Sequence, residues 1–309
     1  MTQRQALNWD TEGGHWPLRH LSSFVETSRL RWHVQLAQHP DPKASCILLL
    51  HGTGASTHSW RAMLPLLSDN YSVLAIDLPG HGFTTMPQAS DIATLFSIPG
   101  MAAGVAELLM QMQFKPDIVV GHSAGAAVAC MLTLNGHIQP QRLVSINGAL
   151  LPLDGLAGQV FSPLAKMLTK APWIPEFFAW QAGRASVLNK LLEGTGSILD
   201  TEGTRLYKTL ISNPSHAQAA LFMMAHWDLH TFWERLKTLQ EPLSLIVGSQ
   251  DLIVPPSVAY RVADALPNLR PQDVISLPNL GHLAHEEHAE WVADVIWPMG
   301  RPAPDKETI

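Results

Sequence analysis

A serine between two glycines, Ser123 in the stretch VVGHSAGAAV at 119–128, is the residue of this chain best suited to nucleophilic chemistry. Gly121 and Gly125 complete the pattern G-x-S-x-G, which places a serine on a tight turn between a strand and a helix. Glycines at these positions indicate a backbone turn that side chains would obstruct. Because so short a pattern is weak evidence alone, the rest of the chain must supply the partners that a nucleophilic serine needs.

Those partners are a base that removes the serine proton and a carboxylate that orients the base. In an open parallel sheet such groups lie just beyond the carboxyl ends of later strands. Two predicted strands, PLSLIVG at 242–248 and DVISLP at 273–278, are followed by Asp251 and His282. The sequence therefore predicts Ser123, Asp251 and His282 as a catalytic triad in that chain order.

Attack of a serine on a carbonyl group creates an oxyanion, which backbone N–H groups in a fixed loop stabilise. One donor follows the nucleophile and is here the N–H of Ala124. The second is expected in HGTGA at 51–55, where Thr53 supplies the N–H and Gly54 allows close approach. His51 is expected to shape this loop through hydrogen bonds.

The substrate pocket is expected to include His51, Gly52, Gly54, His122 and Trp227. His122 is better suited to packing at the serine turn than to acting as the base. Residues 150–235 carry many Trp, Phe and Met residues, most of which we expect in the core between helices and sheet. Side chains of this kind also suit a bulky, flat or flexible apolar ligand, and a small hydrophobic ester-like or tetrapyrrole-related ligand is expected.

The same residues have structural alternatives. Ser123 could permit tight packing of a strand on a helix, and Asp251 could cap a helix that begins near Pro255. Asp154 and Asp228 are rival carboxylates. Asn147 lies at the carboxyl end of the predicted strand at 142–148, where an acid could also lie.

No metal site and no cofactor are predicted. The zincin motif places its histidines four residues apart, whereas His285 and His288 in HLAHEEH are three apart. We therefore expect these two histidines at the solvated start of a helix. Gly52-Thr53-Gly54 lacks the following Gly-Lys of a phosphate-binding loop, which argues against a nucleotide.

Predicted strands alternate with predicted helices along most of the chain. The expected strands are a hairpin at 22–36 and segments at 46–52, 71–82, 117–121, 142–148, 242–248 and 273–278. This alternation predicts an α/β fold with a mostly parallel, doubly wound sheet and an inserted helical cap. The expected division is a first core part at 1–149, the cap at 150–235, a second core part at 236–300 and a disordered tail at 301–309.

Composition narrows the classes of function. The 309 residues carry a formal net charge of −6 without a run of Lys or Arg, which argues against nucleic-acid binding. The two cysteines, Cys46 and Cys130, are expected as free, buried thiols in a reducing compartment. The N-terminal residues lack the apolar core of a secretory signal, and no segment is predicted to span a membrane. A cytoplasmic location is expected.

The motifs LLLHGTGASTHSW, DLPGHGFT, VVGHSAGAA, VGSQDLIVPP and LGHLAHEE together resemble the α/β-hydrolase superfamily over almost the whole chain. A narrower resemblance, over residues 16–295, is to the magnesium-chelatase accessory proteins of bacteriochlorophyll-producing bacteria. It is carried by HGTGASTHSWR, SIPGM, GHSAGAA, NGALLP, FSPLAK, LLEGTGS and GHLAHEE. This resemblance implies a role beside magnesium insertion into protoporphyrin, with magnesium chelatase as a partner, and the triad Ser123, Asp251 and His282.

Two classes of function follow. The first is a serine hydrolase that cleaves a tetrapyrrole-related or other hydrophobic ester without a cofactor. The second is a non-catalytic accessory protein that binds a porphyrin or contacts the chelatase. A general esterase, a C–C bond hydrolase and an aminopeptidase are further alternatives, because the motifs do not identify a substrate.

Overall fold

The structure, a computed structural model, describes residues 6–152, 168, 173–182 and 184–296. The predicted tail, the motif FSPLAK and Asp154 lie outside the described residues, as does part of the predicted cap.

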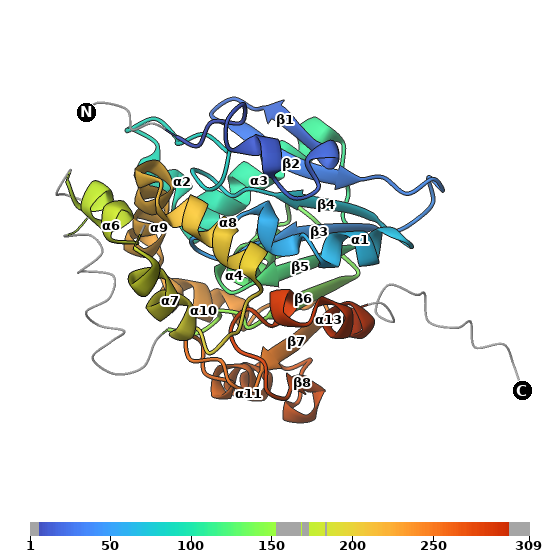
Figure 1. Cartoon of the computed structure of the whole chain (residues 1–309). Helices are drawn as coiled ribbons and strands as arrows, with labels where there is room; N and C mark the ends of the chain where they lie inside the picture. The colour runs from blue at the N-terminus through green and yellow to red at the C-terminus, as the bar shows by residue number, and fades with distance from the viewer. Residues whose placement is uncertain (1–5, 153–167, 169–172, 183, 297–309) are drawn as a thin grey trace, which may run out of the picture.

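Eight strands form one sheet in the order β1-β2-β4-β3-β5-β6-β7-β8 (Figure 1). The strands are β1 (Ser22–Glu26), β2 (Arg31–Ala37), β3 (Cys46–Leu50), β4 (Ser72–Ile76), β5 (Ile118–His122), β6 (Arg142–Ile146), β7 (Leu243–Gly248) and β8 (Val274–Leu277). The hairpin β1–β2 is antiparallel and joins β4 in antiparallel register, whereas β4, β3 and the strands through β8 are parallel. The predicted mostly parallel sheet is confirmed, and the predicted hairpin forms its edge.

The helices before β6 are α1 (Met63–Ser68), α2 (Ile92–Leu95), α3 (Ile98–Met112) and α4 (Ala124–Leu134). Those between β6 and β7 are α6 (Ile174–Ala182), α7 (Ala185–Glu193), α8 (Thr201–Ile211), α9 (Pro214–His226) and α10 (Leu229–Leu236). After β7 come α11 (Ser257–Ala265), α12 (Ala284–Glu287) and α13 (Ala289–Ile296). Short 3-10 helices are η1 (Gly13–His15), η2 (Arg19–Leu21), η3 (Thr57–Trp60) and η4 (Pro271–Asp273).

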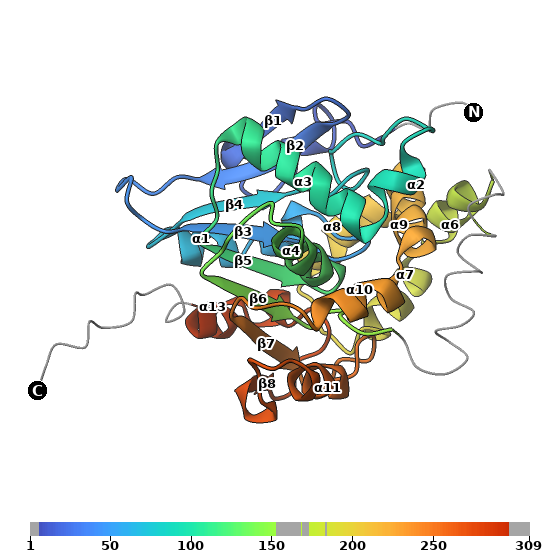
Figure 2. The same cartoon turned by 180° about the vertical axis from the view of Figure 1, so that it is seen from behind.

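The core lies on both faces of the sheet, because side chains along a strand point alternately to opposite sides. Leu48 and Leu50 of β3 belong to the cluster that contains buried residues of α3 and α4. Ile47 and Leu49 belong to a second cluster with residues of α1 and α13. Figure 1 shows α1 and α13 on one face, and Figure 2 shows α3 and α4 on the other. The sheet is therefore doubly wound.

Helices α6 to α9 gather at one end of the sheet in both views (Figures 1 and 2). Within the described residues, the segment between β6 and β7 contains helices and no strand. The exact limits of the predicted cap stay a prediction. Within the described ranges, no helix has the length and apolar character needed to cross a bilayer.

Two expectations about burial hold only in part. Phe222, Met223 and Phe232 of the inserted helices are buried, and Trp227 and Trp233 pack against the core. Three aromatic side chains are instead 51–63% exposed: Trp173, just before α6, and Phe177 and Trp180 on α6. Both cysteines are free, but Cys46 is only half-buried.

Candidate functional site

Ser123 lies between the end of β5 and the start of α4, and its backbone has φ 51° and ψ −119°. A positive φ is strained for a residue that carries a Cβ, and it persists where the surroundings hold it. The Ser123 N–H donates to the Ile146 carbonyl at 3.0 Å, and its own carbonyl accepts from Ala126 and Ala149, both at 3.1 Å. These bonds fix a serine that is 9% exposed in a sharp turn.

The two glycines around Ser123 are explained by close backbone approach. A Cβ on Gly121 would lie 2.5 Å from the Ala126 nitrogen, and one on Gly125 would lie 2.2 Å from the Leu50 carbonyl oxygen. Neither contact can be relieved by moving a side chain, because both neighbours are backbone. The interpretation of G-x-S-x-G as a turn that side chains would obstruct is confirmed.

His282 and Asp251 form a buried pair in two neighbouring loops. Nδ1 of His282 donates to Oδ2 of Asp251 at 2.7 Å. The other carboxylate oxygen, Oδ1, accepts the N–H groups of Ile253 and Val254, each at 2.8 Å. The side chains of His282 and Asp251 are 8% and 0% exposed. With Nδ1 as donor, Nε2 of His282 is the ring nitrogen that can take up a proton.

Asp251 therefore closes a turn of its own loop and does not cap α11, which begins at Ser257. The rival Asp228 accepts the N–H groups of His230 and Thr231 at 3.1 Å and caps α10 from the surface. Asp228 is thus used at the start of α10, and Asp251 is the carboxylate that accepts from His282.

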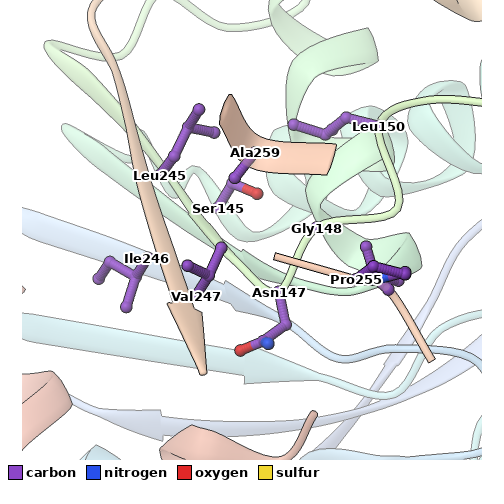
Figure 3. Close-up of a pocket in the computed structure, with 10 residues that line it drawn as sticks. Ser145, Asn147, Gly148, Leu150, Leu245, Ile246, Val247, Pro255 and Ala259 are labelled. Atoms are coloured by element: carbon purple, nitrogen blue, oxygen red, sulfur yellow. The ribbon is translucent and has the colours of Figure 1, made fainter. Parts of the chain in front are cut away.

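Asn147, which follows β6, adds a contact that the sequence did not predict. Its Nδ2 donates at 2.6 Å to Oδ2 of Asp251, the oxygen that also accepts from His282. Asn147 is 1% exposed. Figure 3 shows Asn147 beside a small cavity whose lining is mostly apolar, from Leu245 on β7 to Pro255. Asn147 thus forms a hydrogen bond with Asp251, the carboxylate that follows the next strand, β7.

The loop after β3 lies directly against the serine turn. A Cβ on Gly52 would lie 2.9 Å from both the Ser123 Cβ and the His122 Nδ1. His51 accepts the Leu78 N–H on Nε2 at 2.9 Å, so its Nδ1 donates to the Gly52 carbonyl at 2.8 Å. Burial lowers the pKa of His51, which keeps this imidazole neutral.

The two expected oxyanion donors directly follow the residues of this contact in the chain, Thr53 after Gly52 and Ala124 after Ser123. Ala124 is the first residue of α4, where backbone N–H groups have no acceptor within the helix. Thr53 is exposed, and its hydroxyl donates to the Met223 sulfur of α9 at 3.3 Å. Gly54 has φ 76°, which glycine adopts without strain. Their role at an oxyanion stays a prediction.

His216 of α9 joins the same loop to the inserted helices. Its Nδ1 accepts the Gly82 N–H at 3.0 Å, so Nε2 donates to the Gly54 carbonyl, also at 3.0 Å. Burial lowers the pKa of His216 to about 4. Sequence reasoning missed this residue, because its partners are 134 and 162 positions away and PSHAQ carries no motif.

His122 packs at the serine turn as expected. Its Nε2 donates to the His282 carbonyl at 2.8 Å, and its ring lies 4.8 Å from the His282 ring and 4.3 Å from the His285 ring. Burial holds the pKa of His122 well below its usual range. Trp227, at the end of α9, is half-buried and packs on the larger core cluster, so its pocket role stays a prediction.

The expectation that His285 is solvated is wrong, whereas His288 is exposed. His285 is fully buried, because α12 packs its ring 4.6 Å from the Trp60 ring. Burial lowers the pKa of His285 to about 3. Across the described ranges, no group of three or more His, Cys, Asp or Glu residues could hold a metal ion.

The chain is similar to known proteins in sequence and in fold. The sequence pattern of the alpha/beta hydrolase family matches residues 47–295. The magnesium-chelatase 30 kDa subunit of Rhodobacter capsulatus is 34% identical over 282 residues, which cover 91% of this chain and 95% of that protein. An uncharacterized hydrolase of Bacillus subtilis is 26% identical over 85% of this chain and 93% of its own length. A crystal structure of an alpha/beta hydrolase fold protein from Burkholderia ambifaria has a TM-score of 0.72 and 19% identity, over 96% of this chain and all of that one, and shares the fold.

Proposed function

Because the chain belongs to the alpha/beta hydrolase family, and within it to the family of the magnesium-chelatase 30 kDa subunit, we propose that it is a serine hydrolase with Ser123 as nucleophile. One observation carries this proposal. A serine held at a strained positive φ shares one edge of the sheet with a histidine whose Nδ1 donates to a buried carboxylate.

The proposed reaction follows from the roles of these groups. Nε2 of His282 takes the proton from Ser123 Oγ as that oxygen bonds to the carbonyl carbon of an ester. The carbonyl oxygen becomes an oxyanion, which the N–H groups of Thr53 and Ala124 bind. Asp251 keeps Nδ1 protonated and stabilises the imidazolium.

The intermediate then collapses as the bond to the leaving alcohol breaks and the alcohol takes the proton from Nε2. Water attacks the acyl-serine, gives its proton to Nε2 of His282, and releases the carboxylic acid as Ser123 recovers its proton. Every proton passes through His282, and no cofactor is consumed.

The substrate class we propose is a hydrophobic ester related to a tetrapyrrole. Apolar side chains of α9 support this substrate class. Met223 contacts Thr53, which supplies one of the proposed oxyanion donors, and Phe222 precedes Met223 on the same helix. The 34% identical relative is named as a magnesium-chelatase subunit, which supports an accessory role in bacteriochlorophyll synthesis. Both cysteines are free thiols, which supports a cytoplasmic location.

Hydrolysis of p-nitrophenyl esters of increasing chain length and of protoporphyrin methyl esters tests the chemistry. Wild type should release product and Ser123→Ala should not, while Ser212→Ala in α8's C-terminal turn serves as a serine control away from the turn. Retained hydrolysis in Ser123→Ala would contradict the proposal.

A second assay tests the accessory role. Magnesium insertion into protoporphyrin by a chelatase is measured with wild type or Ser123→Ala added. Stimulation by wild type alone supports a catalytic accessory role. Equal stimulation by both proteins would instead favour a non-catalytic, porphyrin-binding or chelatase-contacting role.

A further inference from the structure

The turn Gly194–Ser197, between α7 and α8, lies against the two loops that carry the acid and the histidine. The Thr195 carbonyl accepts the N–H of His282 at 3.0 Å, and the Leu252 N–H approaches the same oxygen at 3.5 Å. Ser197 Oγ accepts the N–H of Leu283 at 2.8 Å. Two consecutive peptide groups of the histidine loop are thus bound by residues inserted between β6 and β7.

The backbone of this turn lies in close contact with the backbone of the loops that carry Asp251 and His282. Gly196 has φ 73°, and a Cβ there would lie 2.0 Å from the Gln250 carbonyl oxygen. A Cβ on Gly281 would lie 2.3 Å from the Gly196 carbonyl carbon and 2.5 Å from the Ser197 nitrogen. These contacts explain why glycines stand in the motifs LLEGTGS and GHLAHEE, which come from distant parts of the chain.

A single carboxylate joins Ile198, the residue directly after the turn, to the histidine loop. Glu287 of α12 accepts the Gly281 N–H on Oε1 at 2.7 Å and the Ile198 N–H on Oε2 at 3.0 Å. Inside the turn, Thr195 Oγ1 accepts the Ser197 N–H at 3.2 Å. The peptide groups from Gly281 to Leu283 therefore each have a fixed partner.

We propose that the turn Gly194–Ser197 positions the catalytic histidine, and that Ser197 and Glu287 act as positioning residues for His282. The inference rests on the proposed function, because it concerns the base of that reaction. The backbone of His282 is held at its N–H by Thr195 and at its carbonyl by His122. A base that transfers a proton must stay within hydrogen-bond reach of the nucleophile, and a displacement of about 1 Å costs about a hundredfold in rate. The segment inserted between β6 and β7 therefore helps to hold the proposed triad in place through Thr195 and Ser197.

The test uses Ser197→Ala and Glu287→Gln in the full chain, and measures the second-order rate of labelling by a fluorophosphonate against pH. Ser197→Ala leaves the Leu283 N–H without its acceptor, and Glu287→Gln turns one acceptor into a donor. Each variant should label about tenfold more slowly, as expected for loss of one hydrogen bond to the loop. The pH midpoint of labelling should differ from the wild-type value, because a displaced imidazole lies at a different distance from its carboxylate partner.

Ser212→Ala is the matched control, because its hydroxyl is buried and makes no hydrogen bond within the described part of the chain. This variant should label like wild type, and thermal unfolding should show that all three variants are folded at the temperature of the assay. Wild-type rates and pH midpoints in both Ser197→Ala and Glu287→Gln would overturn the inference. Equal slowing in Ser212→Ala would also overturn it, by showing a general effect of the inserted helices. A wild type that is not labelled at all would overturn the proposed function itself, and is thereby distinguished from both.

Discussion

Asn147 and His282 share one oxygen of Asp251: the asparagine Nδ2 lies 2.6 Å from Oδ2, and the histidine Nδ1 lies 2.7 Å from it. Asp251, which follows β7, therefore accepts hydrogen bonds from residues that follow the two neighbouring strands, Asn147 after β6 and His282 after β8. Such bonds to a charged acceptor are shorter and stronger than bonds between neutral groups. The acid's orientation depends on position 147 as well as on its own loop.

Asn147→Gly and Asn147→Ala should both lower kcat by about tenfold or more, because each removes a hydrogen bond to a charged group. Asn147 has φ 48°, which glycine tolerates and alanine does not. Alanine should therefore be less stable than glycine by about 1 kcal/mol. Ester hydrolysis and urea unfolding measure the two effects separately. Equal kcat in wild type and the glycine variant would show that Asn147 does not orient Asp251.

Gly52→Ala should abolish ester hydrolysis with a smaller effect on folding. The added methyl group would lie 2.9 Å from Cβ of Ser123, so the loop or the nucleophile must shift. Gly14→Ala is the control, since a Cβ there meets nothing within 4 Å. Kinetics and thermal unfolding of both variants check this expectation. Hydrolysis at the wild-type rate by Gly52→Ala would mean that this loop has no part in catalysis.

His285 should make the protein sensitive to acid. Burial lowers its folded-state pKa to about 3 from the ordinary 6.5, so the unfolded chain binds the proton more readily. The stabilisation is complete above about pH 6.5 and is lost as the pH falls toward about 3. At about pH 5 this histidine should lower the free energy of unfolding by about 2 kcal/mol relative to neutral pH.

His285→Leu should remove that part of the acid loss, whereas His288→Leu, at an exposed site, should retain it. Urea unfolding at neutral pH and at about pH 5 provides the measurement. The same acid loss in His285→Leu as in wild type would show that His285 does not take part in the linkage.

Much of the parallel sheet could be predicted, because each of its central strands is a continuous run of apolar residues in the sequence. Cys46–Leu50 and Leu243–Gly248 are nearly fully buried and read as continuous hydrophobic segments. The turn at Ser123 and the loops with Asp251 and His282 follow such strands, so their meeting at one edge is a consequence of strand direction.

Contacts between distant segments could not be predicted in this way. The bonds from His216 to Gly54 and from Ser197 to Leu283 join residues with no shared periodicity, 162 and 86 positions apart. The burial of His285 was missed because HLAHEEH is polar in composition, and only the packing of α12 on Trp60 removes that ring from water. On α6 the reverse holds, because Phe177 and Trp180 are apolar but more than half exposed.

The most direct test of the central claim is reaction of the purified protein with a fluorophosphonate, followed by mass spectrometry of its peptides. We predict one adduct, on Ser123, formed by wild type and absent from Ser123→Ala, with a much slower reaction in His282→Ala. An adduct on another serine, or no adduct in protein shown to be folded, would contradict the claim that Ser123 is an activated nucleophile.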